Sequence, residues 1–324
     1  MASSTRDGVE TVASKVVGQS RRESLEEFLS DRTIMAFITV VPATLMFALI
    51  VAAPIVWSVV ASLHSINALS PAWEFVGLGN YVELIGETRF WESFGYNLVW
   101  AFSTSVLNTV LGTAVALLLN QNFRFKRILT PVMLFPYLVP SAFFGYIVMW
   151  ITTQQWGLLN QLLIASGLIT SENVVAWFTG DPWTAMATLV GVHNWKFSIF
   201  VAILVYAKLQ GIPDDLYEAA IMSGATKYQQ FRDITLPYIK NVLFITVLLR
   251  GLWNFNMFDL IWVATNANPI DSLVTLPVYA YKIGFQFQEL GKSNAVATTL
   301  FVVLSVVGII YFKTAKPSQE VRVE

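Results

Sequence analysis

Long runs of residues without a single charge constrain this chain more than any other feature. The first run, 33–63, contains no Asp, Glu, Lys or Arg, and five shorter apolar runs follow it, three of them also without charge and two interrupted by one or two charged residues. About 20 apolar residues in a helix cross a bilayer, and only helices or closed barrels satisfy their backbone polar groups there. The whole chain is 55% hydrophobic and 13% charged, about half the charge of a soluble domain. We therefore predict an all-α, polytopic membrane protein.

Six transmembrane helices are predicted from these runs. They are 33–63, 98–119, 128–152, 184–207, 241–265 and 295–312. Pro42 and Pro54 predict kinks in the first span. The fourth and fifth spans are the least apolar, because Lys196 and Arg250 interrupt them.

The Lys and Arg residues gather in alternate loops, which predicts the orientation. Fifteen of the twenty lie in the two tails and in the loops after the second and fourth spans. Cytoplasmic loops carry such an excess. We expect a multi-pass protein of the cell membrane with both termini in the cytoplasm. Its parts would be a tail at 1–32, which lacks the apolar core of a signal peptide, a transmembrane domain at 33–312 and a tail at 313–324.

Several classes of function lack the residues that they need. The chain has no Cys and two His, which argues against a thiolate or His-rich metal site, and we expect no metal and no cofactor. A net charge of -1 gives no reason to expect nucleic acid. The sequence contains no recognisable combination of a nucleophile with a general base, which a membrane enzyme would need. An ion-coupled secondary transporter is a weaker alternative, since its usual inverted repeats are absent and Asp259 is the only deep acid.

The segment EAAIMSGATKYQQFRDITLP, at 218–237, separates two apolar spans but does not have the composition of a plain connector. Pro213 and the acids after it predict a helix start. Ser223 and Gly224 predict its end, because Gly accepts a left-handed backbone. Thr226 and Gln229 form a capping box, so a second helix should begin at once and end before Pro237. The charge pattern places this pair of short helices in the cytoplasm.

This segment resembles the cytoplasmic signature of membrane subunits in binding-protein-dependent ABC importers. The matching residues are Glu218, Ala219, Ala220, Gly224, Ile234, Leu236 and Pro237. In that family the segment, here 211–237, contains a coupling helix, here about 213–223, that docks into a cleft on the ATPase subunit. The resemblance runs from about 47 to 310. Toward its end it is similar to the larger membrane subunit of maltose-type carbohydrate importers, although Asn266-Ala267-Asn268-Pro269 replaces the frequent Gly-Gly-Pro.

The resemblance implies a type I ABC importer permease fold and a role in ATP-driven import of a mono- or oligosaccharide. Such a subunit does no chemistry, because a separate ATPase subunit dimer hydrolyses ATP. The implied partners are that dimer, a second permease subunit that is usually a different chain, an extracellular or periplasmic solute-binding protein and membrane lipid. The sugar itself and the partner chains are not implied.

Polar and aromatic residues inside the spans predict where solute passes, because polar groups there are costly and mark cavities. Arg250, Asn254 and Met257 share a helix face, with Trp253 beside them. An indole face beside an amide suits a sugar ring. The residues that occupy the places of the family's sugar site are Tyr137, Ser141, Phe200, Trp253, Asn254 and Met257. Helix packing is the alternative role for such side chains.

Two cations within the membrane leave a second solute class open. Lys196 and Arg250 would suit an anionic solute such as a sugar phosphate or glycerol phosphate. The alternative is that they snorkel or form ion pairs. Asp259 is one candidate partner for Lys196, although it lies nearer the outer end of its span.

Overall fold

The structure, a computed structural model, describes residues 32–70, 72–121, 124–265 and 273–314. It divides into two units, Met1–Val60 and Ala61–Glu324. The first unit contains α2 (Arg32–Phe47), the π-helical turn η1 (Ala48–Ala52) and all but the end of α3 (Ala53–Ser62). Most of the two predicted tails lies outside the described residues, and so does the turn at 266–269.

The second unit is mainly helical. Its strands β1 (His64–Ile66) and β2 (Trp73–Phe75) pair antiparallel, with Ser65 opposite Glu74. Its helices and π-helical turns are α4 (Gly79–Gly86), α5 (Thr88–Asn120), α6 (Lys126–Leu138), α7 (Ser141–Ile151), α8 (Leu158–Ala165), α9 (Pro182–Leu209), α10 (Asp214–Met222), α11 (Lys227–Gln230), η2 (Phe231–Thr235), α12 (Leu236–Phe255), α13 (Asp259–Ala264), α14 (Leu276–Tyr281), η3 (Lys282–Gln286) and α15 (Leu290–Thr314).

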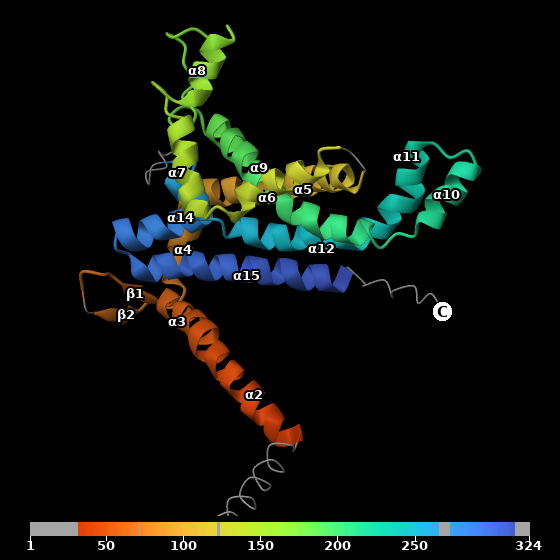
Figure 1. The fold of residues 1–324 in the computed structure, drawn as a ribbon. Coiled ribbons are helices and arrows are strands. Elements are labelled where there is room, and N and C mark those ends of the chain that lie inside the picture. The colour runs from red at the N-terminus through yellow and green to blue at the C-terminus, as the bar shows by residue number, and fades with distance from the viewer. Residues whose placement is uncertain (1–31, 71, 122–123, 266–272, 315–324) are drawn as a thin grey trace, which may run out of the picture. The chain divides into compact units, whose positions relative to one another are not determined.

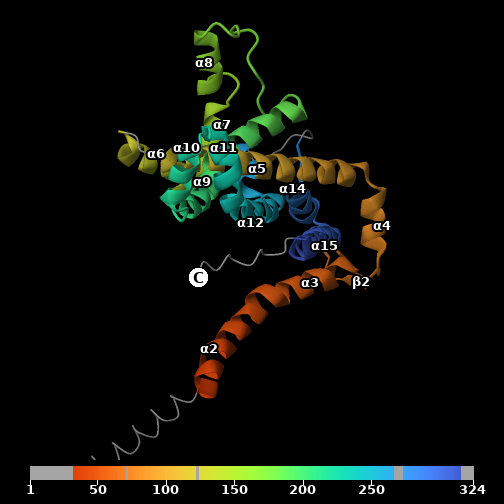
Figure 2. The same cartoon turned by 90° about the vertical axis from the view of Figure 1, so that its right-hand side faces the viewer.

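Helices α5, α9 and α12 pack against one another and form the centre of this unit (Figure 1). Small residues on α5 allow the close approach, as is usual between membrane helices. A Cβ atom on Gly112 would lie 2.5 Å from the Ser198 carbonyl oxygen of α9. One apolar cluster surrounds Trp100 and Leu189, and a second contains Ala116 and Ile239. Helices α10 and α11 lie beyond one end of α12 (Figure 1), and they face the viewer when the molecule is turned by 90° (Figure 2).

Among the described residues, five helices are long and apolar enough to cross a membrane. They are Met35–Ser62, Thr88–Asn120, Pro182–Leu209, Lys227–Phe255 and Leu290–Lys313. The pair α6 and α7 would make a sixth span, but the two helices are bent by 98°. The six predicted spans therefore have counterparts, with two corrections.

The first correction concerns the third span, which was predicted as one run at 128–152. It breaks between Leu138 and Ser141, because Val139 is held extended before Pro140, as the residue before a proline usually is. The second concerns the fifth span, predicted at 241–265. Its helix ends at Phe255, and α13 begins separately at Asp259.

The predicted helix end before Pro237 is also wrong, because the helix runs without interruption from Lys227 to Phe255. A proline inside a helix lacks an N–H group, and its ring clashes with the carbonyl four residues earlier. For Pro237 that carbonyl belongs to Asp233, which lies in η2. Pro54 has the same relation to Ile50 in η1. In both places a π-helical turn, which is wider than an α-helical one, accommodates the proline.

Candidate functional sites

The predicted coupling segment has the expected caps, but only its first helix, α10, is short, because α11 continues through η2 into α12. Helix α10 ends where Gly224 adopts φ 78°. The Gly224 N–H donates to Ile221 O at 2.9 Å, and the Ala225 N–H donates to Ala220 O at 2.9 Å. These bonds satisfy the last carbonyls of the helix. At the start of α11, the Gln229 N–H donates to Thr226 Oγ1 at 3.3 Å. The predicted helix stop and capping box are both confirmed.

Helix α10 is held on one side and open on the other. The Tyr217 hydroxyl lies 2.8 Å from Thr235 Oγ1, and its ring packs on the second apolar cluster. No residue of α10 is fully buried. Glu218 and Ala219 are exposed, and Met222 is 88% exposed. The helix is thus anchored to the base of α12 while it presents an apolar surface outward.

The remaining signature residues lie where η2 joins α12. Ile234 is half-buried and packs on the second apolar cluster. Leu236 and Pro237 are exposed. The signature residues therefore lie in two places, on the exposed helix α10 and at the junction between η2 and α12.

Lys196 is buried at the break between α6 and α7. It is 1% exposed, and its Nζ donates to Pro136 O at 3.0 Å and to Val139 O. A helix leaves its last carbonyls unsatisfied and carries a partial negative charge at that end. The ammonium group therefore compensates the broken end of α6. Lys196 is therefore held by these backbone carbonyls, and no ion pair with the candidate partner Asp259 is seen among the described residues.

Arg250 lies in a layer of polar side chains between α5, α9 and α12. Its Nη2 donates to Asn254 Oδ1 at 2.9 Å and to His193 Nε2 at 3.2 Å. Asn254 is fully buried, and its Nδ2 donates to Thr104 Oγ1 at 2.9 Å and to Ser105 Oγ at 3.2 Å. Three helices are thus joined by hydrogen bonds without a carboxylate, whereas Arg250 Nε has no partner among the described residues.

Three of the predicted solute contacts form an aromatic group. The rings of Phe200 and Trp253 lie 5.1 Å apart, and those of Tyr137 and Phe200 lie 6.5 Å apart. Trp253 is 48% exposed. Ser141 begins α7 beyond the break, and Met257 follows the end of α12 and packs on the first apolar cluster. The side chains of Tyr137, Phe200 and Trp253 thus lie together. The Asn254 side chain is fully buried and points instead toward α5.

One residue that the sequence reasoning missed connects these parts. The Phe197 ring centroid lies 5.0 Å from Lys196 Nζ and 4.9 Å from Arg250 Cζ. Both cations therefore lie near one ring, an arrangement that stabilises positive charge. Phe197 follows His193 by four residues on α9, so helical spacing would have indicated it.

The polar positions on α5 were also missed. Thr104, Ser105 and Asn108 are buried within an apolar span. Asn108 Nδ2 donates to Asn194 Oδ1 on α9. Such residues within a span indicate interhelical hydrogen bonds, and this was the available signal.

Comparisons with known proteins agree on one kind of membrane component. Residues 108–315 match the family described as binding-protein-dependent transport system inner membrane component. The trehalose/maltose transport system permease protein MalF of Thermococcus litoralis is 29% identical, over 87% of this chain and 94% of that protein. The sulfoquinovosyl glycerol transport system permease protein SmoG of Agrobacterium fabrum is 31% identical, over 88% of this chain and 91% of that protein.

A solved structure shares the fold. One chain in the crystal structure of a bacterial ABC transporter involved in the import of the acidic polysaccharide alginate aligns with a TM-score of 0.76. The alignment covers 90% of this chain and 98% of that chain at 19% identity. The likeness extends over nearly the whole of both chains, so the fold predicted from the sequence is confirmed.

Proposed function

The chain belongs to the family of binding-protein-dependent transport system inner membrane components, and from this premise we propose that it is the permease subunit of an ATP-driven sugar importer. The family match covers residues 108–315. Its relatives include permease proteins for trehalose and maltose and for sulfoquinovosyl glycerol. The ion-coupled alternative has no support from this family. ATP hydrolysis falls to a separate ATPase subunit.

One observation carries the mechanism. A single helix connects the proposed coupling segment to the proposed solute site, since it runs from Lys227 to Phe255. Tyr217 of α10 bonds to Thr235 near one end, and Trp253 lies near the other, roughly 27 Å away at 1.5 Å per residue. When the ATPase subunits close on α10, this helix transmits the movement to the aromatic group. The solute path then alternates between outward-open and inward-open states.

The exposed aromatic group is the proposed solute surface. Sugars bind to aromatic rings through their apolar C–H faces, and Trp253 is exposed enough to offer one. Tyr137 and Phe200 extend this surface, while Ser141 and Met257 remain proposed neighbours of the path. Asn254, Arg250 and Lys196 have their hydrogen bonds to the protein, so we assign them positioning roles.

The proposed partners follow from the exposed surfaces. The outward face of α10 fits an ATPase subunit dimer, and the open side of Trp253 fits a path shared with a second permease subunit, most simply a different chain. An external binding protein would deliver the sugar. In a related fold, the bacterial alginate ABC transporter is found in complex with an alginate pentasaccharide-bound periplasmic protein. Both termini are proposed to lie in the cytoplasm.

The test is solute binding to the importer's external binding protein, measured by calorimetry, followed by uptake into proteoliposomes that contain the whole complex. We expect tight binding of a neutral mono- or disaccharide and uptake that requires ATP and the ATPase subunits. The unpartnered Arg250 Nε favours one alternative, an anionic solute. Binding of phosphorylated or acidic solutes alone would establish that alternative, and uptake without the ATPase subunits would refute the importer.

A further inference from the structure

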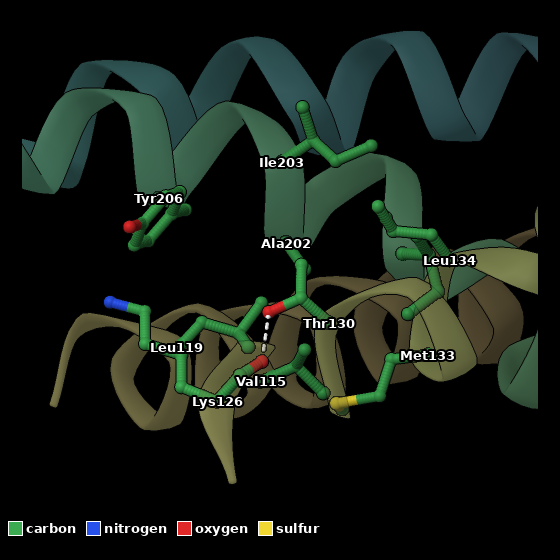
Figure 3. A pocket seen from close by; sticks show the side chains of 10 residues that line it. Val115, Leu119, Lys126, Thr130, Met133, Leu134, Ala202, Ile203 and Tyr206 are labelled. Atoms are coloured by element: carbon green, nitrogen blue, oxygen red, sulfur yellow. Dashed lines mark hydrogen bonds between the residues drawn. The ribbon is translucent and has the colours of Figure 1, made fainter. Parts of the chain in front are cut away.

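A groove of about 230 Å³ lies between α5, α6 and α9, apart from the aromatic group (Figure 3). Val115, Met133, Leu134 and Ile203 contribute apolar walls. Thr130 also lines it, but its hydroxyl donates to Lys126 O at 2.8 Å. Thr130, Lys126 and Tyr206 are the only lining residues with polar side-chain groups, so the walls are mainly apolar and suit a hydrocarbon chain better than a sugar.

A cation lies at the edge of this groove. Lys126 begins α6, and its Nζ lies 5.4 Å from the centroid of the Tyr206 ring (Figure 3). In the described part of the chain, no carboxylate lies within ion-pair distance of it. Arg124 and Arg127 flank it and are exposed. An apolar groove with an unpaired cation at its edge matches an amphiphile that has an anionic head group.

We propose that the groove binds one acyl chain of an anionic phospholipid from the cytoplasmic leaflet, with its phosphate group on Lys126. The assignment of the leaflet rests on the proposed orientation, in which α5 ends and α6 begins at the cytoplasmic surface. Basic residues just outside membrane helices attract anionic lipids, and basic pockets between such helices bind their head groups. The bound chain would fill the space between α6 and α9 on the side of α6 that leads to its break.

The binding test uses the whole purified complex in detergent and two lipids with identical acyl chains, phosphatidylglycerol and phosphatidylcholine. Native mass spectrometry gives the apparent dissociation constant for each. We expect phosphatidylglycerol to bind more tightly and Lys126→Gln to weaken it about fivefold, the effect of one basic residue near a membrane surface. Arg127→Gln, which removes a neighbouring charge that does not line the groove, is the matched control and should change it less than twofold.

A second pair of variants tests the groove itself. Met133→Trp should fill it and weaken binding of both lipids, whereas Val132→Trp, exposed on the same helix and outside the lining, should not. Equal effects of Lys126→Gln and Arg127→Gln would overturn the site in favour of diffuse loop charge. No effect of Met133→Trp would overturn the acyl-chain groove.

A photoreactive acyl chain distinguishes lipid from protein in the groove. We expect it to label residues such as Leu134 and Ile203 in the intact complex. Its exclusion by the second permease subunit would overturn the proposal. The readouts need neither solute nor ATP, so a wrong sugar assignment would leave them unchanged, and failed lipid binding would leave the uptake test valid.

Discussion

The polar layer around Arg250 and the surface of α10 are opposite in burial: one buries polar side chains and the other exposes apolar ones. In the layer, charged and amide groups are buried and bonded within the chain, as Asn254 is to Thr104 and Ser105. On α10, apolar side chains such as Met222 are exposed. The first region makes most of its hydrogen bonds within one chain, since leaving buried polar groups unpaired is costly, and Arg250 Nε is an exception among the described residues. We propose that another protein, the ATPase subunit, covers the second.

Lys196→Met should have the largest effect, because it removes a buried charge whose hydrogen-bond partners are backbone carbonyls of this chain. The change leaves the carbonyls of Pro136 and Val139 buried without their donor. Loss of a buried charged partner should lower the free energy of unfolding by about 3 kcal/mol. Unfolding in mixed micelles measures it, with Lys240→Met as the control, because Lys240 is exposed. Equal stability of Lys196→Met and the parent, with loss of transport alone, would instead make Lys196 a solute contact.

Ala219→Arg should act on the other region only. Ala219 is exposed on α10, so the fold tolerates a long side chain there, but the close approach of an ATPase subunit does not. We expect ATP-driven uptake to fall about twentyfold, the equivalent of about 1.8 kcal/mol, with an unchanged melting temperature. Ala219→Ser keeps a small side chain and should retain uptake. Normal uptake by Ala219→Arg would remove α10 from the docking surface.

Trp253→Ala tests the proposed solute surface, because this side chain lies beside Arg250 of the polar layer but is exposed. Loss of one aromatic face should raise the KM for uptake about tenfold, since such contacts contribute up to about 1.5 kcal/mol. Trp195→Ala, which removes an exposed indole from α9, is the control and should leave the KM unchanged. Similar KM values for both variants would place the solute elsewhere.

Glu87→Gln should have the smallest effect and extends the comparison to the predicted outer side. Burial alone would raise the pKa of Glu87, but hydrogen bonds from Lys292 and Tyr279 bring that pKa below its usual value. A lowered pKa contributes stability above the unfolded pKa and loses it as the pH falls through the folded value.

The Gln variant should therefore lose less stability than the parent when the pH falls from 5 to 3, by under about 1 kcal/mol for a partly exposed ion pair. Melting temperatures across this range measure the difference. Identical pH dependence of the two proteins would show that Glu87 does not contribute.

Local signals were sufficient to predict where the spans lie, though not that the third and fifth are broken, and to predict the caps of the coupling segment. A run without charge identifies a span, and the φ of Gly224 and the capping box at Thr226 depend on neighbouring residues only. These features do not require knowledge of the rest of the chain, which is why the sequence predicts them.

Features that depend on distant residues were not predictable in this way. Lys196 bonds to carbonyls about sixty residues earlier in the chain, so its partner could not be found by spacing along one helix. Asn254 was predicted on a solute-facing side, but α5 covers it. The break before Ser141 did have a local signal in Pro140, and the continuous hydropathy of the run concealed it.

The π-helical turn η2 also sets the rotation of α11 about the helix axis relative to the proposed solute site on α12. A π-helical turn contains one residue more than an α-helical one, and one residue corresponds to about 100° of rotation around the axis. The side chains of α11 therefore point about 100° away from where an uninterrupted α-helix would place them relative to Trp253. A one-residue deletion in η2 would restore α-helical geometry and turn the attached α10 by that angle, so this segment should tolerate substitutions far better than changes in length.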